Sequence, residues 1–169
     1  MIVHFSLQSN SKLHHVAPNL YYGNLEAAHC AKLDNMVTVH ACKEPCHKQV
    51  LHYQKSLDAQ HPEYLYAIRE RHLYLNMIDP PLPLFRHEMF AAFFAFVDNK
   101  IAENNMVIHC NQGLSRAPSL ALLYMAKRLN LLSNDNYAVA SAEFKKRFPY
   151  SPGAGIASFL SDNWVALGA

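Results

Sequence analysis

Cys110 and Arg116 are the residues whose types and spacing are best suited to chemistry on a phosphate group. Cys110 follows the apolar run Val107–Ile108, and Arg116 opens an apolar segment, with five residues between them. Five residues can wrap one turn of backbone around an anion and aim N–H groups at it, where the helix dipole also favours negative charge. Arginine adds a planar fork that matches two phosphate oxygens. The spacing therefore predicts a phosphate-binding loop built around a nucleophilic thiolate.

The residues of this loop form the predicted phosphate site. Gly113 at its centre can adopt backbone angles that are closed to other residues. His109 precedes Cys110 in a strand and so points to the opposite face, where we expect it to hydrogen-bond the backbone and hold the loop. A bare Cys-x5-Arg pattern is also compatible with a buried structural cysteine, but the strand, glycine and helix around it favour catalysis. The predicted phosphate-binding residues are Asn111, Gln112, Gly113, Leu114, Ser115 and Arg116.

Asp79 is the predicted partner of this thiolate. A departing oxygen needs an acid to protonate it, and Asp79 lies where an apolar strand runs into the proline-rich segment Pro80–Pro83. An aspartate before proline is also ordinary turn chemistry. The catalytic interpretation is favoured because the Cys110 loop follows one crossover helix downstream.

These motifs resemble those of the cysteine-dependent phosphatases of the dual-specificity type. The signature of that family is His-Cys-x2-Gly-x2-Arg followed by Ser or Thr, with a general-acid Asp upstream; here Asp79 lies 31 residues before Cys110. The segments 16–24, 37–41 and 148–152 also resemble family segments, so the likeness covers most of the chain. The resemblance implies Cys110 as nucleophile, Arg116 as phosphate clamp, and Asp79 as general acid and then general base.

Residue 117 departs from the family pattern. Ala117 stands where the family usually has a hydroxyl that supports the thiolate as it leaves during hydrolysis of the phosphocysteine. Ser119, two residues on, is not expected to substitute for it. We therefore expect the first chemical step to be intact and the second to be slowed.

Composition predicts one globular domain. The 169 residues are 51% hydrophobic and 17% charged, which suits a single phosphatase domain over 1–169 with its core at about 13–165. The net charge of +2 is too weak to favour nucleic acid or an anionic membrane as a partner. The N-terminus lacks the features of a signal peptide, and four cysteines fit no dense disulfide framework. These features predict a cytoplasmic protein of undetermined oligomeric state.

Strands and helical patterns alternate along the chain, which predicts an α/β fold with a central, mostly parallel twisted sheet flanked by helices. We expect helices at 24–32, 85–104, 117–129 and 134–147, with a cap region at Ser133–Asp135. Within the second helix, Met89, Phe93, Phe96 and Ile101 recur at near-helical spacing and are expected to face the core.

A metal site is not expected. The pattern His40-x-Cys42-x3-Cys46-His47 contains the usual zinc ligands, but its spacing is loose and no second pair is evident. No cofactor is expected either.

The uncharged loop side chains indicate the substrate class. Arg116 is the one fixed cation of the motif, which disfavours polyphosphoinositides. The resemblance implies a shallow cleft that accepts phosphotyrosine, and phosphoserine or phosphothreonine, in proteins or peptides. RNA 5′-triphosphates and carbohydrate phosphates remain alternative substrates. A slow or inactive phosphoprotein-binding pseudophosphatase and a rhodanese-type sulfurtransferase, which needs no upstream acid, are the alternative functions.

Overall fold

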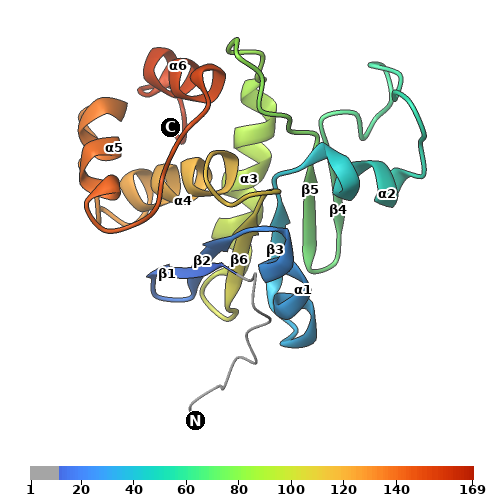
Figure 1. Ribbon diagram of the computed structural model, residues 1–169, viewed down its shortest axis with the longest axis horizontal. Coiled ribbons are helices and arrows are strands. Elements are labelled where there is room, and N and C mark those ends of the chain that lie inside the picture. The colour runs from blue at the N-terminus through green and yellow to red at the C-terminus, as the bar shows by residue number, and fades with distance from the viewer. Residues whose placement is uncertain (1–11) are drawn as a thin grey trace.

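A six-stranded sheet forms the central layer of the computed structural model, which describes residues 12–169 (Figure 1). Its order is β1-β2-β6-β3-β5-β4; the pairs β2–β6, β6–β3 and β3–β5 are parallel, and the outer pairs β1–β2 and β5–β4 are antiparallel. The prediction of a mostly parallel sheet is confirmed. The strands are β1 (Leu13–Ala17), β2 (Leu20–Gly23), β3 (Val37–His40), β4 (Tyr66–Arg69), β5 (His72–Leu75) and β6 (Met106–His109).

Helices cover both faces of this sheet, as predicted. Neighbouring strand residues point to opposite faces of the sheet. Those on one face pack into a large core beneath α3–α6, and those on the other face pack into a smaller cluster beneath α1. Met106 and Ile108 of β6 lie in the large core, whereas Val107 lies in the small cluster. The helices are α1 (Leu25–Leu33), α2 (Lys48–Leu51), α3 (His87–Lys100), α4 (Arg116–Lys127), α5 (Tyr137–Lys145) and α6 (Ala154–Asn163); a π-helical turn, η1 (Lys43–His47), precedes α2.

Helix ends differ by a few residues from the sequence-based ranges. The fourth predicted helix starts later than expected because Asn136 is its N-cap and accepts a hydrogen bond from Val139 N at 3.0 Å. The expected cap region forms a turn instead, in which Ser133 Oγ accepts from Asp135 N at 3.2 Å. The stripe on α3 is confirmed, because Met89, Phe93 and Phe96 are buried in the large core.

No helix among residues 12–169 is long and apolar enough to cross a membrane. The N-terminal residues considered above as a signal sequence lie outside the described part of the chain. One feature was not predicted: Cys42 and Cys46 form a disulfide, while Cys30 and Cys110 are free.

Candidate active site

The Cys110 loop connects the carboxyl end of β6 to the amino end of α4. Cys110 is only 2% exposed, and the backbone N–H of Ala117, in the first turn of α4, donates to its Sγ at 3.4 Å. Donors at a helix N-terminus stabilise negative charge, as the sequence led us to expect of this position. The sulfur of Cys110 therefore lies beside a backbone donor at the amino end of α4.

Gly113 gives the loop its shape. Its φ is +72°, in the left-handed region, and a Cβ there would lie 2.8 Å from the backbone of both Gly23 and Asn24. The loop is also bonded to this β2–α1 junction, because Leu25 N donates to Asn111 O at 3.2 Å and Cys110 N donates to Gly23 O at 3.3 Å. Glycine at 113 is required by both conformation and space.

Arg116 is oriented by two hydrogen bonds. Its Nη1 donates to Met77 O at 2.9 Å and its Nη2 donates to Asn111 Oδ1 at 2.8 Å, while Asn111 Nδ2 donates to Glu44 O at 2.8 Å. The remaining nitrogen, Nε, is buried and has no hydrogen-bond partner within residues 12–169. The guanidinium plane is thus fixed beside the loop, and Asn111 serves to hold it there.

Asp79 reaches the same cavity from the loop after β5. Its side chain is exposed, and a Cβ on Gly153 would collide with its carboxylate. A Cβ on Gly155 would collide with the carbonyls of Pro80 and Leu82. The segment that carries Asp79 therefore packs directly against the amino end of α6, with no room for side chains between them.

One cavity of about 380 Å³ brings these predicted residues together. Cys110, Arg116 and Asp79 all line it, although they come from three segments of the chain. Gly113 is the one predicted phosphate-binding residue that does not line the cavity; it lies beneath the loop against β2. The lining residues are Asp79, Cys110, Asn111, Gln112, Leu114, Ser115, Arg116, Ser151, Pro152 and Gly153.

Sequence reasoning missed Gly153 as part of this site. Its backbone N–H donates to Ser115 Oγ at 2.8 Å, and Ser151 N donates to Leu114 O at 2.8 Å, so this segment supports the loop from the side opposite β2. The Pro-Gly-Ala-Gly composition of 152–155 indicates a close approach of backbones, but not which segment is approached.

His109 points away from this cavity, as predicted for the neighbour of Cys110 in a strand. Its Nδ1 donates to Cys110 O at 3.4 Å, and its Nε2 lies 2.6 Å from Nδ1 of His40 on β3. Burial lowers the pKa of His109 to about 4, so its imidazole is neutral at physiological pH. His109 therefore contacts the Cys110 loop from the opposite face of the sheet, through the backbone carbonyl of Cys110.

Ser119 does not reach the nucleophile. Its Oγ is 2.8 Å from the hydroxyl of Tyr150, which is in turn 2.8 Å from the hydroxyl of Tyr137. All three side chains are buried, and this chain of hydroxyls joins α4 to α5 and the segment before α6. Among the described residues, the hydrogen bond from α4 to Cys110 Sγ comes from the backbone N–H of Ala117, whose side chain carries no hydroxyl.

Known proteins resemble the chain in sequence only distantly. No family model matches it. Over 127 residues it is 21% identical to a probable dual specificity protein phosphatase of Dictyostelium discoideum, an alignment that covers 75% of the chain and 28% of that protein. The chain thus spans just over a quarter of that relative's length.

Solved structures match the fold over nearly the whole chain. A variant of human DUSP28 superposes with a TM-score of 0.63 at 20% identity, covering 92% of this chain and 95% of that one. The human tyrosine phosphatase-like serine/threonine/tyrosine-interacting protein superposes with a TM-score of 0.62 at 18% identity, covering 93% of this chain and 98% of that one. With the Cys-x5-Arg loop at the expected strand–helix junction, the resemblance to dual-specificity phosphatases is confirmed at the level of the fold: the chain has the α/β fold of these proteins.

Proposed function

We propose that the protein is a cysteine-dependent phosphatase that hydrolyses phosphomonoesters on proteins through a phosphocysteine formed on Cys110. The observation that carries this proposal is the meeting of Cys110, Arg116 and Asp79 in one cavity at the N-terminus of α4. The upstream acid weighs against sulfur transfer, which needs no such group. No cofactor takes part in the proposed reaction.

In the first step the thiolate of Cys110 attacks phosphorus, and the bond from phosphorus to the leaving oxygen breaks. Asp79 gives its proton to that oxygen, while the loop N–H groups and Arg116 bind the phosphoryl oxygens. The buried Nε of Arg116, unpartnered within residues 12–169, is a donor that such an anion would satisfy.

In the second step Asp79, now a carboxylate, takes a proton from water as the water oxygen attacks phosphorus. The sulfur–phosphorus bond breaks and the electron pair returns to Cys110 as thiolate. The N–H of Ala117 donates to that sulfur at 3.4 Å and supports its charge. Phosphate then leaves, and Asp79 is again protonated when the next substrate binds.

The surface around Asp79 supports a peptide substrate. Ile78, Leu82 and Leu84 are 51%, 60% and 69% exposed, and all three belong to the segment that carries Asp79. Exposed apolar side chains beside a phosphate site suit a polypeptide better than a sugar or a lipid headgroup. We therefore favour phosphotyrosine, and phosphoserine or phosphothreonine, in proteins or peptides, with no nucleic acid or membrane partner.

A phosphoprotein-binding role with slow turnover is the second candidate, and Ala117 is the observation that favours it.

We further propose a single domain over 1–169 with its core at about 13–165. The reaction needs Cys110 as a free thiol, which favours a reducing compartment such as the cytoplasm.

The test compares the purified protein with its Cys110→Ser variant on an aryl phosphate, on phosphopeptides and on phosphoinositide vesicles. We expect turnover of the aryl phosphate and phosphopeptides, and loss of turnover in the variant with retained vanadate affinity, because the loop donors and Arg116 remain. Residual activity above about one per cent would exclude Cys110 as the nucleophile. Vanadate binding without any turnover would favour the binding role.

A further inference from the structure

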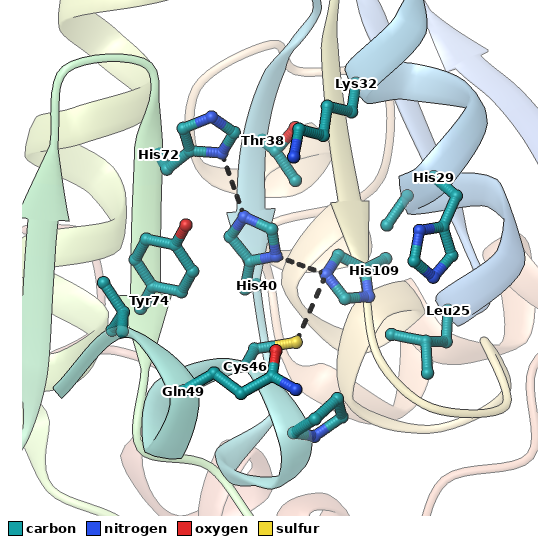
Figure 2. Close-up of a pocket in the computed structure, with 13 residues that line it drawn as sticks. Leu25, His29, Lys32, Thr38, His40, Cys46, Gln49, His72, Tyr74 and His109 are labelled. Atoms are coloured by element: carbon teal, nitrogen blue, oxygen red, sulfur yellow. Dashed lines mark hydrogen bonds between the residues drawn. The ribbon is translucent and has the colours of Figure 1, made fainter. Parts of the chain in front are cut away.

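A second cavity, on the α1 side of the sheet, contains four histidines and a cysteine. It has a volume of about 490 Å³, and His29, His40, His72, His109 and Cys46 all line it. Figure 2 shows that His72, His109 and Cys46 lie around His40, while His29 lies beyond His109. The five side chains come from α1, β3, β5, β6 and η1. None of them lines the cavity of the proposed phosphatase site, although His109 also bonds the carbonyl of Cys110.

The register of the parallel strands brings the histidines together. His40 pairs with His109 across β3 and β6, so their side chains lie on the same face of the sheet. Nδ1 of His40 lies 2.6 Å from Nε2 of His109, and Nε2 of His40 lies 3.0 Å from Nδ1 of His72. Sγ of Cys46 lies 3.9 Å from the same His109 Nε2.

One ligand atom each from His40, Cys46 and His109 lies within 4.8 Å of the other two. In a tetrahedral zinc site, bond lengths of about 2.0–2.3 Å put neighbouring ligand atoms roughly 3.3–3.6 Å apart. The sulfur is therefore at nearly the right separation from His109 Nε2. To hold an ion, the two imidazole nitrogens have to move apart by less than an ångström, and the widest of the three separations, at most 4.8 Å, has to close by up to about 1.2 Å. Imidazole and thiolate together are a donor set typical of zinc.

In both imidazoles, the nitrogen that would not bind the ion already lies beside a hydrogen-bond partner. His109 donates from Nδ1 to Cys110 O, which leaves Nε2 free to bind an ion. Without an ion, the 2.6 Å contact places a proton on His40 Nδ1, because His109 Nε2 carries none. Ion binding at His40 Nδ1 moves that proton to His40 Nε2, where Nδ1 of His72 accepts it once His72 carries its own proton on Nε2. Such partners fix the tautomer and orientation of metal ligands.

We propose that His40, Cys46 and His109 form a Zn²⁺ site that opens when the Cys42–Cys46 disulfide is reduced. Cys46 cannot ligate as a thiolate while it is bonded to Cys42. A dithiol reductant transfers two electrons and two protons to this disulfide, giving two thiols and its own disulfide. Zn²⁺ then displaces the proton of the Cys46 thiol, one proton is released, and a water in the cavity completes four ligands.

The test measures zinc binding by competition with a chromophoric chelator, using protein reduced and then freed of reductant under nitrogen. The Cys110→Ser background removes the only other buried free thiol within residues 12–169. We expect one zinc per chain in reduced protein and at least about 100-fold weaker binding in oxidised protein, since one ligand is withheld. Cobalt added in place of zinc should give a thiolate-to-cobalt absorption band.

Cys42→Ser is the matched variant, because it frees Cys46 without removing a ligand. It should bind zinc in air as tightly as the reduced parent does, whereas Cys46→Ala should lose binding in both states. Cys30→Ser, outside the cavity, should behave as the parent. His72→Gln should weaken binding about tenfold through loss of the partner of His40.

A measurement on the unsubstituted chain guards against misfolded variants. Zinc should protect Cys46 of reduced wild-type protein from alkylation, as read by mass spectrometry of the peptide. Equal zinc affinity in the oxidised and reduced protein, unprotected Cys46, or binding that persists in Cys46→Ala would each overturn the proposal. None of these outcomes depends on phosphatase activity.

Discussion

Ala117→Ser tests how the leaving thiolate is supported. Ala117 is fully buried, and its N–H already donates to Cys110 Sγ at 3.4 Å. We therefore expect a hydroxyl added to its Cβ to lie close to that sulfur. A hydrogen bond to a charged group is worth about 1.5–3 kcal/mol. Because roughly 1.4 kcal/mol is a tenfold change in rate, the upper expectation is a tenfold to hundredfold faster breakdown of the phosphocysteine.

The expected gain in steady-state rate is not reduced by a hydroxyl already present, but the substitution carries a cost in stability. Ser119, the neighbouring hydroxyl of α4, is bonded to Tyr150 and gives no support to the sulfur, so the added group does not duplicate an existing one. However, the position is fully buried, and a hydroxyl that is not bonded there costs about 1–3 kcal/mol in stability. Thermal unfolding of the variant measures that cost separately from the rate.

The assay is stopped-flow turnover of an activated aryl phosphate. Wild-type protein should release a burst approaching one equivalent of the aryl alcohol, followed by a slow steady phase. The variant should accelerate the steady phase and leave the burst rate nearly unchanged, since the first step needs no support for a leaving thiolate. Absence of a burst in wild type, with an unchanged steady rate in Ala117→Ser, would refute the reasoning. Ala121→Ser, deeper in α4, is a matched control for a buried added hydroxyl.

Three further substitutions test the rest of the site. Asp79→Asn should lower kcat about 10²–10⁴-fold on poor leaving groups and less on activated ones, and equal losses on both would assign Asp79 a structural role. Gly153→Ala should also lower kcat more on poor leaving groups than on activated ones, because the Cβ of the new alanine collides with the Asp79 carboxylate. An equal loss on all leaving groups would instead assign the effect to the hydrogen bond from residue 153 N to Ser115 Oγ. Arg116→Lys should weaken vanadate binding and lower kcat together, since a point charge cannot reproduce the bidentate fork, and wild-type kinetics would show that residue 116 does not clamp phosphate.

Much of the fold and the shape of the Cys110 loop could be predicted from the sequence because the signals are local. The strand, the glycine and the helix that shape the Cys110 loop lie within about a dozen consecutive residues, so their order already fixes where backbone donors converge. The same holds for the stripe of α3, whose spacing alone identifies its buried face. Asp79 was a weaker signal, since an aspartate before proline is also ordinary turn chemistry and its role depended on the Cys110 loop downstream.

Tertiary structure decided which distant segments meet. Nothing near Gly153 in the sequence shows that it packs against Asp79 and bonds Ser115, because that contact depends on how α6 closes the domain. His109 was missed as a companion of His40 and Cys46 for a similar reason. A shift of one residue in the β3–β6 register would turn His40 and His109 to opposite faces, and that register is set by burial across the whole sheet. The sequence by itself predicted a phosphate-binding loop at this strand–helix junction, and only the packed sheet determined which residues surround that loop.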